Sequence, residues 1–338
     1  MKTRHNPVID PRRATTPGTR ATVAGIAISL FAGAAAAQSY PAKPIRLLVP
    51  FPAAGPAEVM SRIVAKTLSE GLGQPIVIDV QGGGSGTIAM ETASRAAPDG
   101  YTLVVSSLST LVTGPILNPN VRYDPVKSYS PVSMVAIGTS MLLIYPGLPV
   151  KNLRELVELA KSKPGTLNFG SNGIGALPHL AGELFKSITG ADIVHVPYKG
   201  AAPAALGVMA GEVHMLFIVP SGLEQNVRSG KLRALAAAGP KRIAAFPDVP
   251  TTAEAGLPAM ETYTWFGLAG PQGLQPAVVS RLNAEVVKVL ASKDVDDVLS
   301  KQGLEGGAST PEQFGKFIVS ETAKWSKIIK TAGIKLEP

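Results

Sequence analysis

Short apolar runs alternate along the chain with longer segments in which apolar residues recur every three or four positions. The runs have the length of β-strands, and the longer segments have the period of amphipathic helices. This alternation is typical of βαβ units and favours a mainly parallel sheet. Strands are predicted at residues 44–51, 76–80, 101–107, 141–146, 167–170, 193–197, 214–219 and 232–237.

Residues suited to helix ends mark where the helices begin and stop. Gly55 and Pro56 predict the start of the first helix, and the glycines that follow its apolar stripe predict its end. Asn152, with Glu155 three residues later, predicts an N-cap. Thr310 before Pro311 predicts the start of a C-terminal helix. The apolar face of that helix should pack onto a core and comprises Phe314, Phe317, Ile318, Trp325, Ile328 and Ile329.

The first 37 residues are predicted to be a signal peptide. Basic residues precede the apolar segment 21–37, which ends in three alanines before Gln38. This order of a basic, an apolar and a small-residue region predicts export and cleavage near Gln38. A membrane-spanning helix is the alternative, although about 17 residues is at the short limit for a span. The pair Arg12 and Arg13 leaves the twin-arginine route open beside the Sec route.

The remaining residues, about 300, exceed what one hydrophobic core usually serves, so two domains are expected. No long polar linker separates two halves, which suggests that the chain crosses between the domains more than once. Segments 136–143 and 263–268 are the candidate crossings. Such a pair of crossings would make a hinge with a cleft between the lobes.

Charge and composition exclude several function classes. The leader holds five of the 32 basic and one of the 24 acidic residues, which leaves 27 and 23, a net charge of about +4. No cluster of Lys and Arg with interleaved aromatic residues follows it, so no nucleic-acid footprint is predicted. The absence of Cys excludes disulfides, thiol nucleophiles and thiolate metal sites.

Two loops have the character of anion sites. Loops 51–55 and 171–175 are rich in small residues, and each lies between a predicted strand and a predicted helix. Backbone N–H groups and the positive end of a helix favour an anion at such a place. An ordinary tight turn is the alternative for each loop. Two facing helix N-termini, one in each lobe, could clamp a carboxylate.

Other chemistry finds little support in the sequence. Gly84-x-Gly86-x-x-Ala89 imitates a dinucleotide motif but follows the second strand rather than the first. The histidines after the leader are isolated in the sequence, without metal-ligand spacing, and no Gly-x-Ser-x-Gly motif of serine hydrolases is present. Tyr198 and Lys199 directly follow a predicted strand, and Lys199 is either a ligand contact or simply solvated.

Ordered motifs run through nearly the whole chain after the leader. In these motifs the sequence resembles the tripartite tricarboxylate transporter receptor family, also called the Bug family of extracytoplasmic solute receptors. The motifs lie at residues 40–46, 98–103, 123–125, 179–185, 195–200, 230–235 and 247–256.

The resemblance implies a type II periplasmic-binding-protein-like α/β fold, with two α/β lobes around a ligand cleft and a hinge of crossing strands. Lobe 1 would comprise residues 38–139 and 261–338, and lobe 2 residues 140–260. Ligands would be held largely by loop backbone, hydroxyl groups and ordered water. Carried over to this sequence, the ligand contacts are Ala53, Ala54, Gly55, Ser106, Ser107, Ser171, Asn172, Gly173, Gly175, Tyr198 and Lys199.

The implied function is that of a periplasmic solute-binding receptor. It would capture a small organic carboxylate and deliver it to the membrane permease subunits of a tripartite transporter. The protein would be a monomer that binds no nucleic acid, uses no cofactor or metal and catalyses nothing. A sensor that reports the ligand to a membrane signalling protein is one alternative. A periplasmic hydrolase or isomerase is another, for which the sequence shows no activated nucleophile or base.

Departures from the family's pattern fall in the same loops. The family usually has Gly at Ala54, Asp at Glu58, Asn-Arg at 80–81, a hydroxyl residue near Ala176 and Asp at Ile218. Loss of polar partners disfavours small, highly charged ligands and leaves room for an apolar body. A carboxylate with an aliphatic or aromatic portion is therefore predicted, rather than citrate or aspartate.

Overall fold

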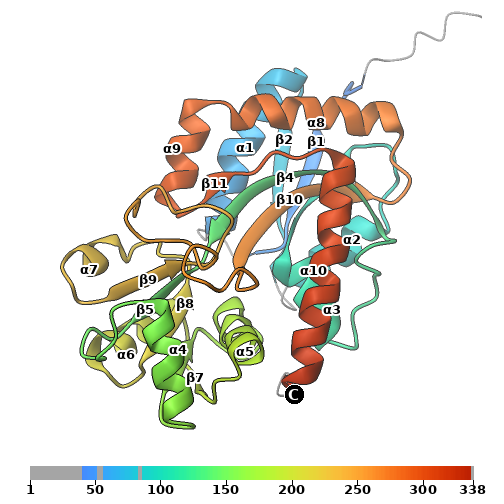
Figure 1. The fold of residues 1–338 in the computed structure, drawn as a ribbon. Helices are drawn as coiled ribbons and strands as arrows, with labels where there is room; N and C mark the ends of the chain where they lie inside the picture. Colours follow the sequence, from blue (N-terminus) through green and yellow to red (C-terminus); the bar gives the residue numbers. More distant parts are fainter. Residues whose placement is uncertain (1–39, 52–55, 83–85, 336–338) are drawn as a thin grey trace, which may run out of the picture. The chain divides into compact units, whose positions relative to one another are not determined.

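The computed structural model describes residues 40–51, 56–82 and 86–335. Within these residues the strands form two sheets, one of six strands (sheet A) and one of five (sheet B) (Figure 1). Sheet A has the order β11-β4-β10-β3-β1-β2, and sheet B has the order β7-β6-β8-β5-β9. The strands of sheet A are β1 (Ile45–Val49), β2 (Ile76–Val80), β3 (Thr102–Ser107), β4 (Tyr129–Thr139), β10 (Tyr263–Pro271) and β11 (Glu305–Gly306). Those of sheet B are β5 (Met141–Ile144), β6 (Asn168–Ser171), β7 (Val194–Pro197), β8 (Met215–Ile218) and β9 (Arg233–Ala237).

The two sheets share one arrangement. In each, a parallel trio lies in the order second, first, third, namely β2-β1-β3 and β7-β6-β8. An antiparallel strand follows each trio, β10 in sheet A and β5 in sheet B. The predicted strands are confirmed to within a few residues, but the prediction of mainly parallel sheets was wrong. The strands next to the passages between the sheets run antiparallel, because the chain leaves each sheet and later returns to it.

Three short segments meet where the chain passes between the sheets. The chain passes once at Ser140, between β4 and β5, and again between β9 and β10. Ser140 N–H donates to Thr262 O at 3.0 Å, Thr262 N–H donates to Ala238 O at 2.7 Å, and Ala238 N–H donates to Ser140 O at 2.7 Å. This closed triangle of backbone hydrogen bonds fixes the three segments to one another. The residue boundaries of the predicted lobes stay a prediction.

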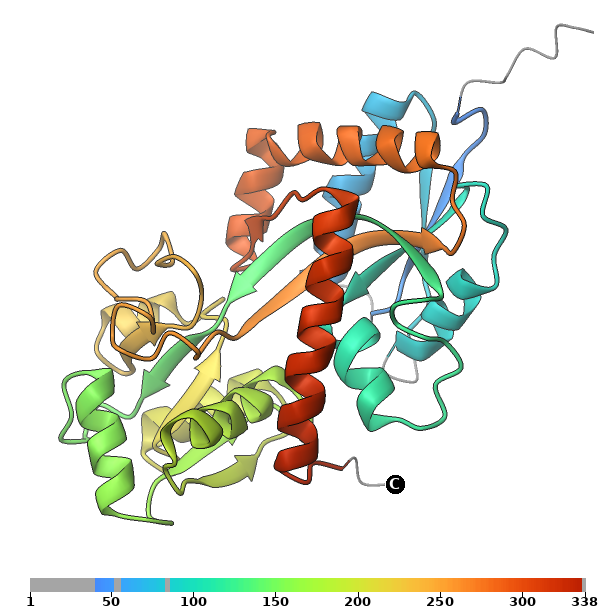
Figure 2. The same ribbon diagram turned by 45° about the vertical axis from the view of Figure 1, so that its right-hand side comes forward.

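The helices cover the sheets and connect their strands (Figures 1 and 2). Helices α1 and α8 pack against each other, and α10 contacts both β4 of sheet A and α5, which contacts sheet B. A π-helical turn at Ser109–Thr113 follows β3. The helices are α1 (Pro56–Leu72), α2 (Thr87–Ser94), α3 (Gly114–Leu117), α4 (Leu153–Ser162), α5 (Leu177–Thr189), α6 (Ala201–Ala210), α7 (Glu224–Arg228), α8 (Pro276–Leu290), α9 (Lys293–Lys301) and α10 (Pro311–Thr331).

Local capping explains where two of these helices begin. Asn152 Oδ1 accepts a hydrogen bond from Glu155 N–H at 2.9 Å, at the start of α4. Thr310 Oγ1 accepts from Gln313 N–H at 3.1 Å, and Gln313 Oε1 accepts from Thr310 N–H at 2.9 Å, at the start of α10. These contacts satisfy first-turn N–H groups that have no partner within the helix. Both predicted helix starts are confirmed.

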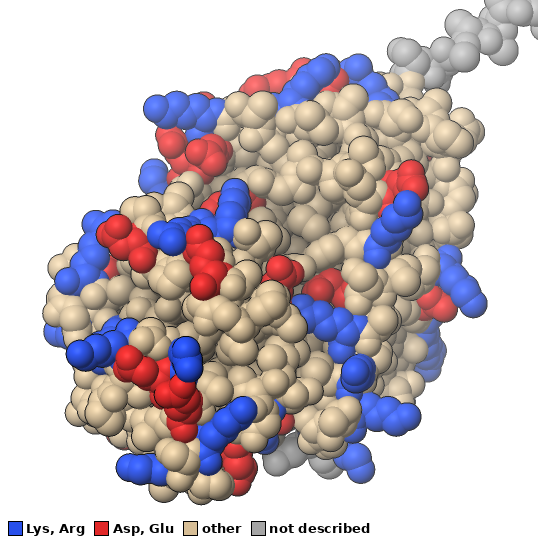
Figure 3. All heavy atoms as spheres, viewed as in Figure 1, with Lys and Arg blue, Asp and Glu red and all other residues tan. Residues whose placement is uncertain are grey.

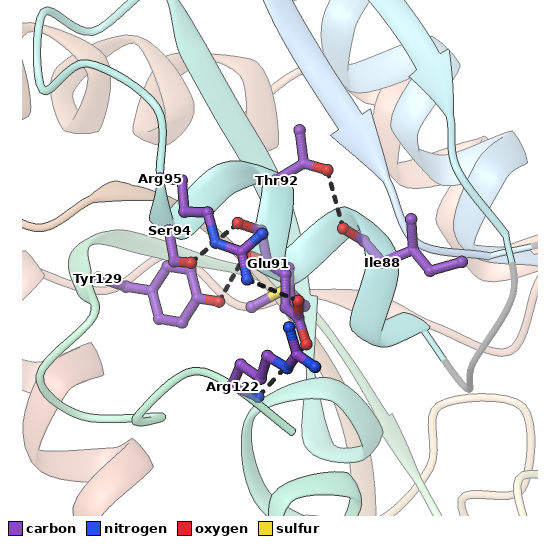
Figure 4. Close-up of polar contacts among 8 residues, drawn as sticks. Ile88, Glu91, Thr92, Ser94, Arg95, Arg122 and Tyr129 are labelled. Atoms are coloured by element: carbon purple, nitrogen blue, oxygen red, sulfur yellow. Dashed lines mark hydrogen bonds and ion pairs between the residues drawn. The ribbon is translucent and has the colours of Figure 1, made fainter. Parts of the chain in front are cut away.

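Helix α2 anchors the connection that leads into β4 (Figure 4). Glu91 Oε2 lies 2.9 Å from Arg95 Nη2, and Glu91 Oε1 accepts from the backbone N–H of Arg122 at 3.3 Å. The hydroxyl of Tyr129 donates to Met90 O at 2.8 Å. Because α2 contacts β1, β3 and β10, these bonds tie the start of the long strand β4 to the centre of sheet A.

The described residues contain no candidate membrane span and no candidate metal centre. No helix among them has the length and apolar character needed to cross a bilayer. No three His, Asp or Glu side chains gather in this part of the chain in a way that could hold a metal ion. On the face shown in Figure 3, Lys and Arg lie interspersed with Asp and Glu.

Candidate ligand-binding site

A cavity of about 490 Å³ lies between the carboxyl ends of the parallel strands of sheet B and the passage between the sheets. Its volume is in the range of small-molecule binding sites. The walls are the loops after β6 and β8, the first turns of α5 and α6, and two residues next to the passage. The lining residues are Ser140, Asn172, Leu177, Pro178, Ala201, Ala202, Ile218, Val219, Ser221, Gly222, Leu223 and Thr264.

Strand order explains why the cavity lies there. From β6, one connection leads through α5 to β7 on one side, and the chain then continues through α6 to β8 on the other side. At such a reversal of strand order, the loops at the carboxyl ends of neighbouring parallel strands diverge and leave a crevice. The loops after β6 and β8 therefore face a common space, which is the cavity.

Two helix N-termini open onto the cavity without a side-chain cap. The N-cap of α5 is Ala176 and that of α6 is Gly200, and neither N-cap side chain accepts a hydrogen bond. The N–H groups in the first turn of a helix have no partner within the helix, and the helix dipole places about half a positive charge there. A carboxylate in the cavity would meet both positive ends.

The side chains that line the cavity are uncharged, and most of them are apolar. Among the lining residues that the structure describes, none carries a charge. Ser140 is fully buried, and its hydroxyl finds no hydrogen-bond partner within the described part of the chain. A buried hydroxyl without a partner is energetically unfavourable, so a polar group of a ligand would stabilise it.

The loop from Ser171 to Gly175 has a defined shape. Ser171 is fully buried, and its hydroxyl donates to Gly173 O at 3.0 Å and accepts from Gly173 N–H at 3.2 Å. Gly173 has φ 140° and Gly175 has φ 75°. These values favour glycine, because residues with a Cβ rarely adopt them. The loop thus turns sharply and brings Asn172 to the cavity wall.

Beneath this loop lies a stacked pair of histidines. The rings of His179 and His195 are 3.8 Å apart between centroids and within 5° of parallel, and Phe169 stacks on His195 at 5.0 Å. Burial, and then His195 and Lys186, lower the pKa of His179 to about 4. Burial, and then Lys186, lower the pKa of His195 to about 4. The two histidines are isolated in sequence but adjacent in space, because β7 pairs with β6 and α5 follows β6.

Of the contacts predicted for the first sheet, the structure describes Ser106 and Ser107. Ala53, Ala54 and Gly55 lie outside the described residues. Ser106 and Ser107 are buried at the end of β3. Ser106 Oγ donates to Gly267 O at 3.2 Å, and Ser107 Oγ accepts from Thr110 N–H at 3.2 Å. Neither Ser106 nor Ser107 borders the cavity, and their role as ligand contacts stays a prediction.

Tyr198 and Lys199 follow β7 but do not border the cavity. The Tyr198 hydroxyl donates to Glu212 Oε2 at 3.3 Å, and its ring lies against Gly207 of α6. Burial, and then the Glu212 carboxylate, raise the pKa of this hydroxyl. Lys199 is exposed. Ligand contact by either residue stays a prediction.

Several cavity residues were missed by sequence reasoning. Ser221 and Gly222 lie in the loop after the carboxyl end of β8, a position that could have been suspected once β8 was taken as a parallel strand. Ala201 and Ala202 open α6, and the glycine before them is a residue type found at helix N-caps. Ser140 carried no local signal, since its place follows from the passage between the sheets.

The packing of Phe169 gives a direct test of how the loop is supported. Gly182 of α5 lies so close to the Phe169 ring that an added Cβ would overlap it. Gly182→Ala is expected to destabilise the protein by about 1 to 2 kcal/mol, because overpacking outweighs the gain in helix propensity. Gly315→Ala is the matched control in α10, where the added Cβ would lie 3.6 Å from Pro131. The control should stabilise by about 0.5 to 1 kcal/mol in urea denaturation, and equal effects of both changes would contradict the packing argument.

Known proteins resemble this chain over most of its length. BugT of Bordetella pertussis (strain Tohama I) is 38% identical over 314 residues, which are 92% of this chain and 96% of that protein. The structure of R. palustris Rpa4515 with adipate is 34% identical, with a TM-score of 0.70 over 88% of this chain and 99% of that one. MatC from Rhodopseudomonas palustris with bound malate is 30% identical, with a TM-score of 0.67 over 86% of this chain and 100% of that one.

These structural likenesses confirm the predicted two-lobed α/β fold of periplasmic binding proteins. The family model described as tripartite tricarboxylate transporter family receptor matches residues 60–334. The chain therefore belongs to the tripartite tricarboxylate transporter receptor family.

Proposed function

We propose that this chain is a periplasmic receptor that captures a small organic carboxylate in the cavity and delivers it to the membrane permease subunits of a tripartite transporter. Members of its family are periplasmic substrate-binding receptors rather than enzymes. Rpa4515 holds adipate and MatC holds malate in their structures, which supports a carboxylate as the class of ligand. Residues 1–37 serve as the cleavable export signal, and the mature protein acts as a monomer.

The observation that carries the proposal is the pairing of two uncapped helix N-termini with a wall that is uncharged and mostly apolar. The N-termini of α5 and α6 supply the positive field that a carboxylate needs. Leu177, Ile218, Val219 and Leu223 suit an aliphatic or aromatic remainder of the ligand. The ligand is therefore a carboxylate with an apolar portion, rather than citrate or aspartate.

Lobe 1 (residues 38–139 and 261–338) and lobe 2 (140–260) hold the ligand between them. Ser140 lies where the chain passes between the two sheets, and its buried hydroxyl offers one hydrogen bond to the ligand. The contacts predicted from the sequence stay part of the proposal, with Ser140, Ser221 and Thr264 added to them. Closure around a ligand discriminates between ligands through the contacts that differ between the open and closed states.

A carboxylate panel tests the proposal. Residues 38–338 are refolded free of ligand and heated with adipate, malate, benzoate or citrate at equal concentrations. Adipate or benzoate is expected to raise the unfolding temperature more than citrate, because a ligand that binds only the folded form stabilises it by mass action. Stabilisation by citrate alone, no stabilisation by any acid, or chemical turnover of a bound acid would overturn the proposal.

A charge placed at the start of α6 should weaken ligand binding strongly. Ala202→Asp puts a carboxylate in the first turn of α6 at the cavity wall, where it competes with the ligand for the same positive end. Like charges about 4 Å apart near a protein surface repel by about 4 kcal/mol, so calorimetry should show a loss of affinity for adipate of roughly 100-fold or more. Ala202→Asn has the same size without the charge and should change the affinity little. Equal losses of affinity in both variants would mean that the larger side chain blocks the cavity, and the role of the helix end in binding a carboxylate would lose its support.

A further inference from the structure

Each ring of the histidine pair holds one end of the loop from Ser171 to Gly175. His195 Nε2 lies 2.7 Å from Ser171 Oγ, at the first residue of the loop. His179 Nδ1 accepts a hydrogen bond from Gly175 N–H at 3.0 Å, at the last residue of the loop. The two rings stack face to face and so form one packed unit. The pair therefore spans the base of the loop that carries Asn172 into the cavity.

The surroundings favour uncharged rings. Phe169 of β6 covers the ring of His195. Strand β8 also packs on α5, and none of its side chains is ionisable. Lys186 of α5 is the cation whose field reaches both rings, and it is 3.0 Å from Glu183 on the same helix. From α10, which also packs on α5, the buried Glu321 is already bonded by Trp325 Nε1 at 2.9 Å.

The hydrogen bond to Gly175 fixes the protonation of His179. A ring nitrogen that accepts an N–H bond carries no proton, so the proton of the neutral His179 ring is on Nε2. A second proton would have to go to Nδ1, where its N–H would face the N–H of Gly175. His179 also lies in the first turn of α5, where the helix dipole disfavours a positive charge.

We infer that the neutral His179 and His195 pair positions the Ser171–Gly175 loop for ligand binding, and that a proton added to the pair releases the loop and its ligand. The inference rests on the proposed function, because the loop borders the same cavity. The two histidines are positioning residues, since neither borders the cavity itself. Their low pKa values keep the loop in its binding shape at neutral pH.

Three variants and the wild type test this with adipate as the probe. His179→Asn keeps an oxygen acceptor near the position of Nδ1 but does not titrate, whereas His179→Leu removes the acceptor. His214→Asn is the control, because His214 lies at the opposite end of β6 and bonds Asn168 at 2.7 Å. At pH 7.5, His179→Leu should bind adipate roughly tenfold more weakly, as expected for an unsatisfied buried N–H, while the other two variants stay close to wild type.

The pH profile separates positioning from mere packing. Adipate itself gains protons near pH 4 to 5, so its affinity is compared between wild type and His179→Asn at each pH. The affinity of the wild type divided by that of His179→Asn should be constant above pH 5.5. It should fall about twofold by pH 4, where half of the His179 rings of the wild type carry a proton. Identical pH profiles, or full affinity in His179→Leu, would overturn the inference.

A measurement without ligand distinguishes this inference from the proposed function. In ¹⁵N NMR spectra of the ligand-free protein, His179 should show an unprotonated Nδ1 at pH 7, and the Gly175 amide signal should move as that ring titrates. If adipate and the other acids fail to bind, the proposed function is lost and the NMR titration alone decides. If the Gly175 amide signal does not move while His179 titrates, the inference is wrong whether or not the acids bind.

Discussion

Phe314→Ala should lower the free energy of unfolding by about 3 to 5 kcal/mol, the usual loss when a buried aromatic ring is removed from a core. Phe314 is fully buried at the start of α10 and meets the Trp265 ring edge to face, with centroids 5.6 Å apart. It also fills the space beside Gly267, where an added Cβ would overlap its ring. The ring thus joins α10 to β10, the long strand that follows the second passage between the sheets.

Phe317→Ala is the matched control for this prediction. Phe317 lies on the same helix and contacts the same Trp265 ring at 5.5 Å, but it is only partly buried. Less area returns to water when its ring is lost, so roughly half of the destabilisation is expected in urea denaturation at neutral pH. A loss for Phe317→Ala as large as that for Phe314→Ala would contradict the assignment of Phe314 to the core.

The stability of the ligand-free protein should fall as the pH decreases from 6.5 to 5. The pKa values of His179 and His195 are about 4 in the folded protein, and an unfolded histidine has a pKa near 6.5. Between these values the unfolded chain binds more protons than the folded one. Stability therefore rises with pH across this window, and the dependence levels off below pH 4, where both states are protonated.

The size of this effect follows from the pKa shifts. Each ring contributes at most about 1.4 kcal/mol per pH unit, and less for His195, which is partly exposed. Because solvent screening reduces the contribution of the partly exposed His195 ring, a loss of about 2 kcal/mol between pH 6.5 and 5 is expected for the pair. Carboxylates with lowered pKa values, such as Glu254 and Asp124, lose their contribution only at lower pH.

Urea denaturation at half-unit steps of pH measures this slope. The double variant His179→Asn with His195→Gln should lose most of it, because neither amide side chain titrates. The lowered pKa of His214, caused by burial, leaves a smaller slope of the same sign in that variant. A wild-type free energy of unfolding that does not change between pH 6.5 and 5 would rule out a neutral buried pair.

Local features of the fold could be predicted because their causes are local. The short apolar run at residues 76–80 predicted β2 at the residues where it occurs. The caps at Asn152 and Thr310 start their helices as expected. A cap acts within one helical turn, so three or four residues contain the whole signal. The motifs along the chain likewise identified the family.

The candidate site was predictable only in part. The loop at 171–175 was expected from small residues between a strand and a helix, and it does shape one wall of the cavity through Asn172. The orientation of Tyr198 toward Glu212 was not foreseen, because Glu212 is brought there by the packing of α6 on sheet B. Residues 52–55 of the other predicted loop lie outside the described residues, so the role of that loop stays a prediction.

By itself the sequence determined most of the strands, several helix starts and the family, since each depends on residues close together in the chain. It did not indicate the first part of β4 or the helices α8 and α9. The tertiary structure decided which distant residues meet. Strand order brought His195 onto His179, and the passage between the sheets carried the buried hydroxyl of Ser140 to the cavity wall. Such meetings depend on long-range backbone pairing and burial, which no short stretch of sequence contains.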